Sequence, residues 1–279
     1  MKQLIYFSFF ILIAAAGFVA CDHDNTNPLT GNDLAAGTGK LSLKFDNMVG
    51  NQDLKLDSIT YTNGSGEDFT VSRLNYFISN IKLVREDGKT YTIPQDSSYF
   101  RILESDPKSQ IITLNQLPEG NYTGMEYIIG VDSLRSVSGI EKRGGALDPA
   151  SDHENDGMYW AWSSGYIFLK LEGSSSKASS ANGKYYYHIG FFGGYDSKTV
   201  NNIKNVKLNF AGNKARVQEN SVPQVRVVAD VLKIFDGPVP ISMAAHPSIM
   251  FDFTLSSNVA NNYKSMFHFG EITQGDLTK

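Results

Sequence analysis

Both tryptophans of the chain lie in one stretch, Gly157-Met158-Tyr159-Trp160-Ala161-Trp162-Ser163-Ser164-Gly165-Tyr166-Ile167-Phe168-Leu169-Lys170-Leu171-Glu172-Gly173. An acidic loop with a histidine precedes the stretch, and Tyr185-Tyr186-Tyr187-His188-Ile189-Gly190 follows it after a spacer rich in serine, alanine and glycine. Aromatic residues favour strands and core packing, so composition alone favours a strand in the middle of a β core. The gathering of carboxylates, histidines and oxidisable rings also fits a metal site, which is the second interpretation of the same stretch.

Alternation of apolar and polar residues predicts strands along most of the chain. The pattern is clearest at Leu41, Leu43 and Phe45, and it slips in phase between Val71 and Leu74, which indicates a bulge in a long strand. The predicted strands cover residues 41–45, 54–56, 69–85, 90–93, 100–103, 110–114, 125–131, 185–192, 206–210 and 225–234.

A single short helix is expected near the C-terminus. Val259, Tyr263 and Met266 stand at helical spacing, and Ser256 or Ser257 is the expected N-cap. Many short strands, abundant turn residues and one late helix are typical of an all-β fold. We therefore predict an antiparallel β-sandwich with one short C-terminal helix.

The N-terminus has the pattern of an export signal. Lys2 precedes an apolar run over residues 4–16, and the ending Gly17-Phe18-Val19-Ala20-Cys21 resembles a bacterial lipobox. We expect a lipoprotein signal peptide over residues 1–20, lipidation of Cys21, a flexible tether over 21–38 and one domain over 39–279. The expected location is the cell envelope, lipid-anchored at the periplasmic or outer-membrane face. The alternative is an ordinary signal peptide with a chance cysteine.

Cysteine count, charge and missing motifs exclude several function classes. Cys21 is the only cysteine of the chain, so disulfides and thiol-based chemistry are not expected in the mature domain. The chain has 25 Lys plus Arg against 29 Asp plus Glu and a net charge of −4, which argues against a nucleic-acid partner. Nucleophile elbows, phosphate-binding loops and His-Glu-x-x-His motifs are missing from the sequence, so we do not expect an enzyme.

An ordered set of segments resembles the MbnP family of proteins. The matching segments span about residues 40–270 and include 131–133, 144–149, 157–162, 165–173 and 187–190. The resemblance implies a secreted β-sandwich related to copper-binding proteins, in which a tryptophan is oxidised to kynurenine and binds copper together with histidines. It also implies a di-haem MauG-like or MbnH-like protein as the partner that carries out the oxidation.

The resemblance places the candidate copper site on four residues of this chain. Trp160 and Trp162 are the oxidisable candidates, His188 is the histidine that matches a family motif, and His246 is the candidate second histidine. Two departures from the family pattern leave it open whether the copper site is kept: no histidine stands two residues after either tryptophan, and the segment 45–47 lacks a histidine that relatives can show.

Calcium is the other candidate metal. Residues Asp152, Glu154 and Asp156 alternate before Gly157 and imitate the opening of a calcium loop, although a solvated acidic loop explains them equally well. Asp132 and Asp148 are either further calcium ligands or turn formers. The alternative function that follows is a surface lipoprotein that binds glycans or proteins through exposed aromatic residues, with calcium stiffening its loops.

Overall fold

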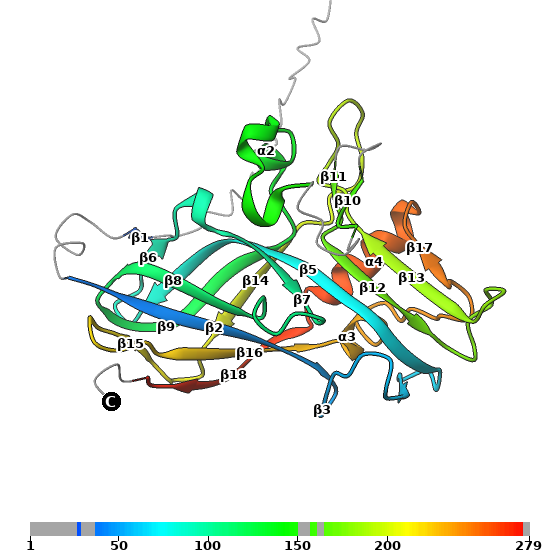
Figure 1. The fold of residues 1–279 in the computed structure, drawn as a ribbon, viewed down its shortest axis with the longest axis horizontal. Helices are drawn as coiled ribbons and strands as arrows, with labels where there is room; N and C mark the ends of the chain where they lie inside the picture. The colour runs from blue at the N-terminus through cyan, green and yellow to red at the C-terminus, as the bar shows by residue number, and fades with distance from the viewer. Residues whose placement is uncertain (1–26, 29–36, 150–156, 161–164, 276–279) are drawn as a thin grey trace, which may run out of the picture.

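Two β-sheets and a hairpin make up most of the described chain. A computed structural model describes residues 27–28, 37–149, 157–160 and 165–275. The larger sheet is built on the path β1-β6-β5-β12-β13-β17, and β5 also pairs with β4, β7 and β9, while β9 pairs with β14 and β15. Its strands are β1 (Asn27–Pro28), β4 (Tyr61–Thr62), β5 (Asp68–Arg85), β6 (Lys89–Thr92), β7 (Tyr99–Leu103), β9 (Gly120–Ile129), β12 (Leu169–Ser174), β13 (Lys184–Ile189), β14 (Lys204–Asn209), β15 (Ala215–Val217) and β17 (Ser248–Ile249) (Figure 1).

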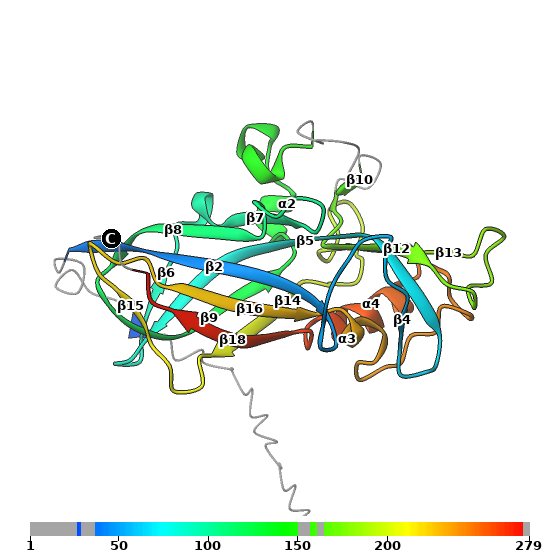
Figure 2. The same ribbon diagram turned by 60° about the horizontal axis from the view of Figure 1, so that its bottom comes forward.

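The smaller sheet has five strands and includes the first long strand of the domain. Its order is β18-β16-β2-β3, and β8 also pairs with β2, on the side away from β16. Figure 2 shows β2, β16 and β18 side by side. These strands are β2 (Thr38–Val49), β3 (Gln52–Asp53), β8 (Ile111–Pro118), β16 (Gln224–Asp230) and β18 (Phe267–Thr273). A separate hairpin consists of β10 (Tyr159–Trp160) and β11 (Gly165–Tyr166).

Aromatic side chains from both sheets meet in the core between them. Phe45 of β2 and Phe267 of β18 come from the smaller sheet, and Tyr76 of β5 and Tyr127 of β9 come from the larger one. The ring centroids of Phe45 and Tyr127 lie 5.9 Å apart and those of Tyr76 and Phe267 lie 5.7 Å apart, both edge to face. This arrangement is the favoured one for buried rings. The prediction of a β-sandwich is therefore confirmed.

Most strand pairings are antiparallel, as predicted, but three of those described are parallel. β16 runs parallel to β2, β17 parallel to β13, and β1 parallel to β6. The long strand β5 contains the predicted bulge, because Glu172 and Gly173 of β12 pair with Arg73 and Val71 and leave Ser72 without a partner in that register. The phase slip in the sequence is thus a real β-bulge.

Two local predictions about strands are wrong. Residues 54–56 do not form a strand, since β3 ends at Asp53. The strand predicted over 225–234 ends at Asp230, whose Oδ1 accepts hydrogen bonds from the amides of Leu232 and Gly50. These bonds turn the chain into α3 (Leu232–Phe235), although the residues there are apolar enough for a strand.

The C-terminal helix is present, but it begins earlier than predicted. α4 (Phe253–Tyr263) starts after Asp252, whose side chain accepts a hydrogen bond from the amide of Leu255 at 2.8 Å. The N-cap is therefore Asp252 rather than Ser256 or Ser257. Ser256 is buried inside the helix, whereas the hydroxyl of Ser257 donates to the side chain of Asn202. Val259 and Tyr263 face the core as expected.

Two further short helices accompany α4 in the described chain, namely α3 and α2 (Ser133–Ser136). No helix within the described residues is long and apolar enough to span a bilayer. The expected signal peptide, Cys21 and nearly all of the tether lie outside the described residues.

Candidate functional site

The stretch that holds Trp160 is not one strand, since it forms the β10–β11 hairpin and then β12. β12 lies between β5 and β13, and its residues alternate between the two faces of the larger sheet. Leu169 and Leu171 point into the core, while Lys170 and Glu172 point to the outer face. The core-packing interpretation therefore holds for one face of β12, and the metal-site interpretation stays a prediction for the other.

Cross-strand register gathers four polar side chains on the outer face. His188 of β13 stands opposite Lys170, and Arg73 of β5 stands opposite Glu172. Nε2 of His188 lies 2.7 Å from Oε1 of Glu172, and Nε of Arg73 lies 3.3 Å from Oε2. Nζ of Lys170 is 3.9 Å from Oε1 and also donates to the carbonyl of Gly157 at 3.2 Å. We call these four residues the Glu172 cluster.

Electrostatics in the Glu172 cluster favour the ionised carboxylate. Burial alone would raise the pKa of Glu172, but the hydrogen bond from His188 and the charges of Lys170 and Arg73 outweigh burial and lower the pKa below its usual value. Glu172 therefore carries its charge at neutral pH and orients the imidazole of His188.

A histidine that binds a metal through one ring nitrogen usually forms a hydrogen bond to a carboxylate, a carbonyl or a water through the other. Nε2 of His188 is engaged by Glu172, and Nδ1 makes no hydrogen bond with any residue that the structure describes. His188 therefore fits the role of a metal ligand through Nδ1. The two neighbouring cations, Lys170 and Arg73, work against a further positive charge, so additional anionic or neutral donors would be needed.

Trp160 packs on the chain just beyond the end of β13, which carries His188. Its indole packs against Gly190, two residues beyond His188, so closely that a Cβ on residue 190 would stand 2.7 Å from a ring carbon. Only glycine leaves room there. Trp160 is 8% exposed, and its ring centroid lies 5.3 Å from that of Phe191 and 5.6 Å from that of Phe251. Trp160 of β10 thus packs on the residue two positions beyond His188.

His246 does not join His188. Tyr186 of β13 pairs in parallel with Ser248 of β17, so His246 precedes the paired position by two residues and His188 follows it by two. His246 itself lies ahead of β17, in a turn where its amide donates to the carbonyl of Ser242 at 2.9 Å. The remaining candidates Trp162, Asp152, Glu154 and Asp156 lie outside the described residues.

The two described calcium candidates have different surroundings. Asp132 caps α2 by accepting from the amide of Arg135 at 2.9 Å, and its other oxygen accepts from Tyr99 and from Gln95. Both carboxylate oxygens of Asp132 are therefore engaged by protein partners, one of them in capping the turn. Asp148 follows the 3₁₀ turn η3 (Gly145–Leu147) and lines a polar cavity of about 870 Å³ together with Arg73 and Arg101.

Within the described parts of the chain, no three His, Cys, Asp or Glu side chains gather closely enough to hold a metal ion. The described residues therefore fit one ligand position for copper, at His188, with an oriented imidazole and a tryptophan nearby. They do not by themselves make a complete copper site. Calcium ligation by Asp132 and Asp148 stays a prediction.

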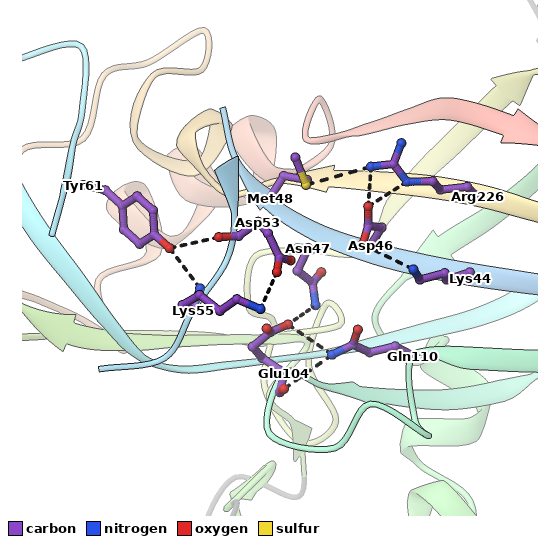
Figure 3. A network of polar contacts seen from close by, with 10 residues as sticks. All are labelled: Lys44, Asp46, Asn47, Met48, Asp53, Lys55, Tyr61, Glu104, Gln110 and Arg226. Carbon is purple, nitrogen blue, oxygen red and sulfur yellow. Dashed lines mark hydrogen bonds and ion pairs between the residues drawn. The ribbon is translucent and has the colours of Figure 1, made fainter. Parts of the chain in front are cut away.

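The segment 45–47, where relatives can show a histidine, carries a different polar network (Figure 3). Oδ1 of Asn47 accepts from the hydroxyl of Tyr76 at 2.8 Å, and Nδ2 of Asn47 donates to Oε2 of Glu104 at 2.8 Å. Burial raises the pKa of Glu104 to about 7, because the Asn47 hydrogen bond and the charge of Lys55 only partly oppose it. Asn47 is therefore held by protein partners through both its amide oxygen and its amide nitrogen.

Sequence reasoning missed two features of this region. The pairing of Glu172 with His188 depends on a register that no local pattern reveals. A cavity of about 710 Å³ beside Trp160 was also missed, although the run Phe191-Phe192-Gly193-Gly194-Tyr195 places aromatic residues at a glycine-rich turn.

Fold and site together define a two-sheet β-sandwich whose larger sheet carries a carboxylate-oriented histidine, with a tryptophan of the separate β10–β11 hairpin nearby. The model of the MbnP family matches residues 38–251, and the chain belongs to this family. A solved structure, MbnP from Methylosinus trichosporium, is similar with a TM-score of 0.51 and 15% sequence identity, covering 74% of this chain and 80% of that chain. At this identity the likeness concerns the fold. No curated protein matches the chain.

Proposed function

We propose that this MbnP-family chain is a lipid-anchored binding protein of the cell envelope that holds copper, with His188 as a ligand. The observation that supports the proposal most directly is the pairing of His188 with Glu172, which orients the imidazole beside Trp160. Imidazole nitrogen is a good copper donor, and a strand in the middle of a sheet is a rigid support for it. The role is binding rather than catalysis.

Oxidation of Trp160 or Trp162 by a di-haem partner is part of this proposal. An indole ring offers no ready lone pair to a metal, whereas the aromatic amine and ketone of kynurenine supply donor atoms. Trp160 borders a cavity and retains some exposure, which supports access of an oxidising partner to this ring or its neighbourhood. The oxidised residue would supply a donor that the described side chains lack.

Lipidation of Cys21 completes the proposal, with a tether that lets the domain stand off the membrane. Labelled palmitate should be incorporated by the wild-type chain in its host and not by Cys21→Ser. Incorporation that persists in the variant would contradict the anchor.

Copper content of the purified mature domain tests the site. Wild-type protein from its native host should retain copper through dialysis, and His188→Ala should lose it. His268→Ala is the matched control, because His268 is exposed on β18 of the smaller sheet. Glu172→Gln should keep His188 but weaken copper affinity by about 10–100-fold, as expected for the loss of an orienting carboxylate. Equal copper retention by the His188 and His268 variants would refute the assignment.

A second candidate function is a surface binding protein for glycans or other proteins, with calcium at most stiffening its loops. The observation that favours it is the exposure of three aromatic side chains near Trp160: Tyr195 is 64% exposed, Phe251 56% and Phe253 44%. Exposed aromatic clusters mark interaction sites more often than isolated ones do. Purified protein that contains no copper and has an unmodified Trp160–Trp162 peptide would favour this second function.

A further inference from the structure

Four aromatic rings form a continuous row at one end of the larger sheet. Trp160 is in its middle, with Phe251 on one side at 5.6 Å and Phe191 on the other at 5.3 Å between ring centroids. Phe253 continues the row, 5.1 Å from Phe191 and nearly perpendicular to it. The row combines the nearly buried Trp160 and Phe191 with the exposed Phe251 and Phe253. It therefore runs from the packed interior out to solvent.

This row lines the cavity of about 710 Å³, which has the size of a small-molecule site. The lining is mostly aromatic, with Phe192 and Tyr195 adding to the row. Among its described lining residues, Asp196 is the one charged side chain, and Ser197 and Thr199 supply the hydroxyls. Neither lysine nor arginine lines it in the described chain.

The loop that carries Asp196 is tightly closed. The amide of Thr199 donates to the carbonyl of Gly193 at 3.0 Å, and the amide of Gly193 donates to Val200 at 3.0 Å. Gly194 has φ +99, and a Cβ there would stand 1.8 Å from the carbonyl oxygen of Ser197. The loop is therefore defined by its backbone, and Asp196 is presented from a preformed turn.

Backbone strain is concentrated at the centre of the same cavity. Phe191 adopts φ +75, a backbone region that residues other than glycine rarely adopt. The fully buried Asn202 holds it there, since its amide donates to the carbonyl of Phe191 at 2.8 Å and its side chain donates to that of Gly190 at 2.9 Å. The backbone is thus held in an unfavourable conformation in which the Phe191 ring contacts Trp160 and Phe253.

We propose that this cavity binds a small organic cation, such as a substituted ammonium with an apolar body. The faces of aromatic rings carry negative potential and attract ammonium groups that have few hydrogen-bond donors to satisfy. Asp196 adds a carboxylate to the lining. The described lining residues include no lysine or arginine that could pair with an anion. A neutral sugar would find few polar partners for its hydroxyls. The proposal shares Trp160 with the proposed copper site but does not use His188.

Calorimetric titration of the mature chain with choline tests this inference. The matched ligand is the neutral isostere of choline in which tert-butyl replaces the trimethylammonium group. We expect saturable binding of choline and at least about tenfold weaker binding of the isostere, as cation–π attraction of about 1–2 kcal/mol implies. Phe253→Ala should weaken choline binding by about tenfold and Asp196→Asn by several-fold.

Two control variants separate the possible outcomes. Ile111→Ala removes an exposed side chain on β8 of the other sheet and should leave choline binding unchanged. His188→Ala should also leave it unchanged, which keeps this test apart from that of the copper site. Equal affinity for choline and its isostere, saturable binding of an oligosaccharide in place of choline, or no choline binding at all would each overturn the inference.

Discussion

The Glu172 cluster and the aromatic cavity lie close together along β13, yet they are built in opposite ways. In the cluster, Glu172 contacts His188 of β13, Arg73 of β5 and Lys170 of its own strand, so its charge is balanced inside the protein. In the cavity, aromatic rings that contact one another also border open space. Satisfied charges stabilise and orient, whereas an open apolar surface is available to a ligand. The first region is suited to positioning His188, and the second to binding.

Trp160→Ala should have the largest effect on stability. The substitution removes a large side chain that packs on Gly190 and Phe191, and such losses cost about 3–5 kcal/mol. The measurement is urea unfolding followed by far-ultraviolet circular dichroism. Phe251→Ala is the matched control within the same row: it removes a side chain that is 56% exposed and should cost less than about 1 kcal/mol. Equal costs would show that the row is not anchored at Trp160.

Glu172→Gln should cost about 2 kcal/mol at pH 7, because it removes a negative partner from the buried Lys170 and the partly buried Arg73. The pKa of Glu172 is lowered in the folded protein, so its contribution is present above the unfolded pKa and is lost as pH falls through the folded one. The difference between variant and wild type should therefore shrink below about pH 4.

Glu126→Gln is the control for that comparison. Glu126 pairs at 3.1 Å with Lys207, whose side chain is largely exposed, and such surface pairs contribute less than about 1 kcal/mol. Unfolding free energies measured at pH 7 and at acid pH for both variants decide the matter. A pH-independent cost of Glu172→Gln would contradict the ion cluster.

Glu104 should show the opposite pH dependence with the smallest effect. Its folded pKa is about 7, above the value in the unfolded chain, so its contribution is present at low pH and is lost as pH rises through about 7. Glu104→Gln keeps the neutral form, so it should match wild type near pH 5 and exceed it by about 1 kcal/mol at pH 8, after allowance for solvent screening. Lower stability of the variant at pH 8 would contradict the raised pKa.

Strand positions could be predicted from the sequence because alternation is a local property. The bulge near Ser72 follows from that alternation and is confirmed. The partner of His188 could not be predicted, since Glu172 reaches it only through the register of β12 and β13. A single sequence holds no local signal for that register.

Helix and cavity illustrate the same limit. Asp252 and Ser256 are both good capping residues, and tertiary packing rather than residue type places Ser256 inside α4. The aromatic row joins three segments that lie far apart in the sequence, at Trp160, Phe191 and Phe251. Their aromatic character was visible, but their contact was not.

The central claim is that a tryptophan beside a carboxylate-oriented His188 forms a copper site. Peptide mass and copper content of the mature domain, purified from its native host, test it most directly. The account predicts bound copper and a Trp160–Trp162 peptide whose mass reflects one oxygen gained and one carbon lost. An unmodified peptide from copper-free protein would contradict it and leave an MbnP fold whose outer face serves another ligand.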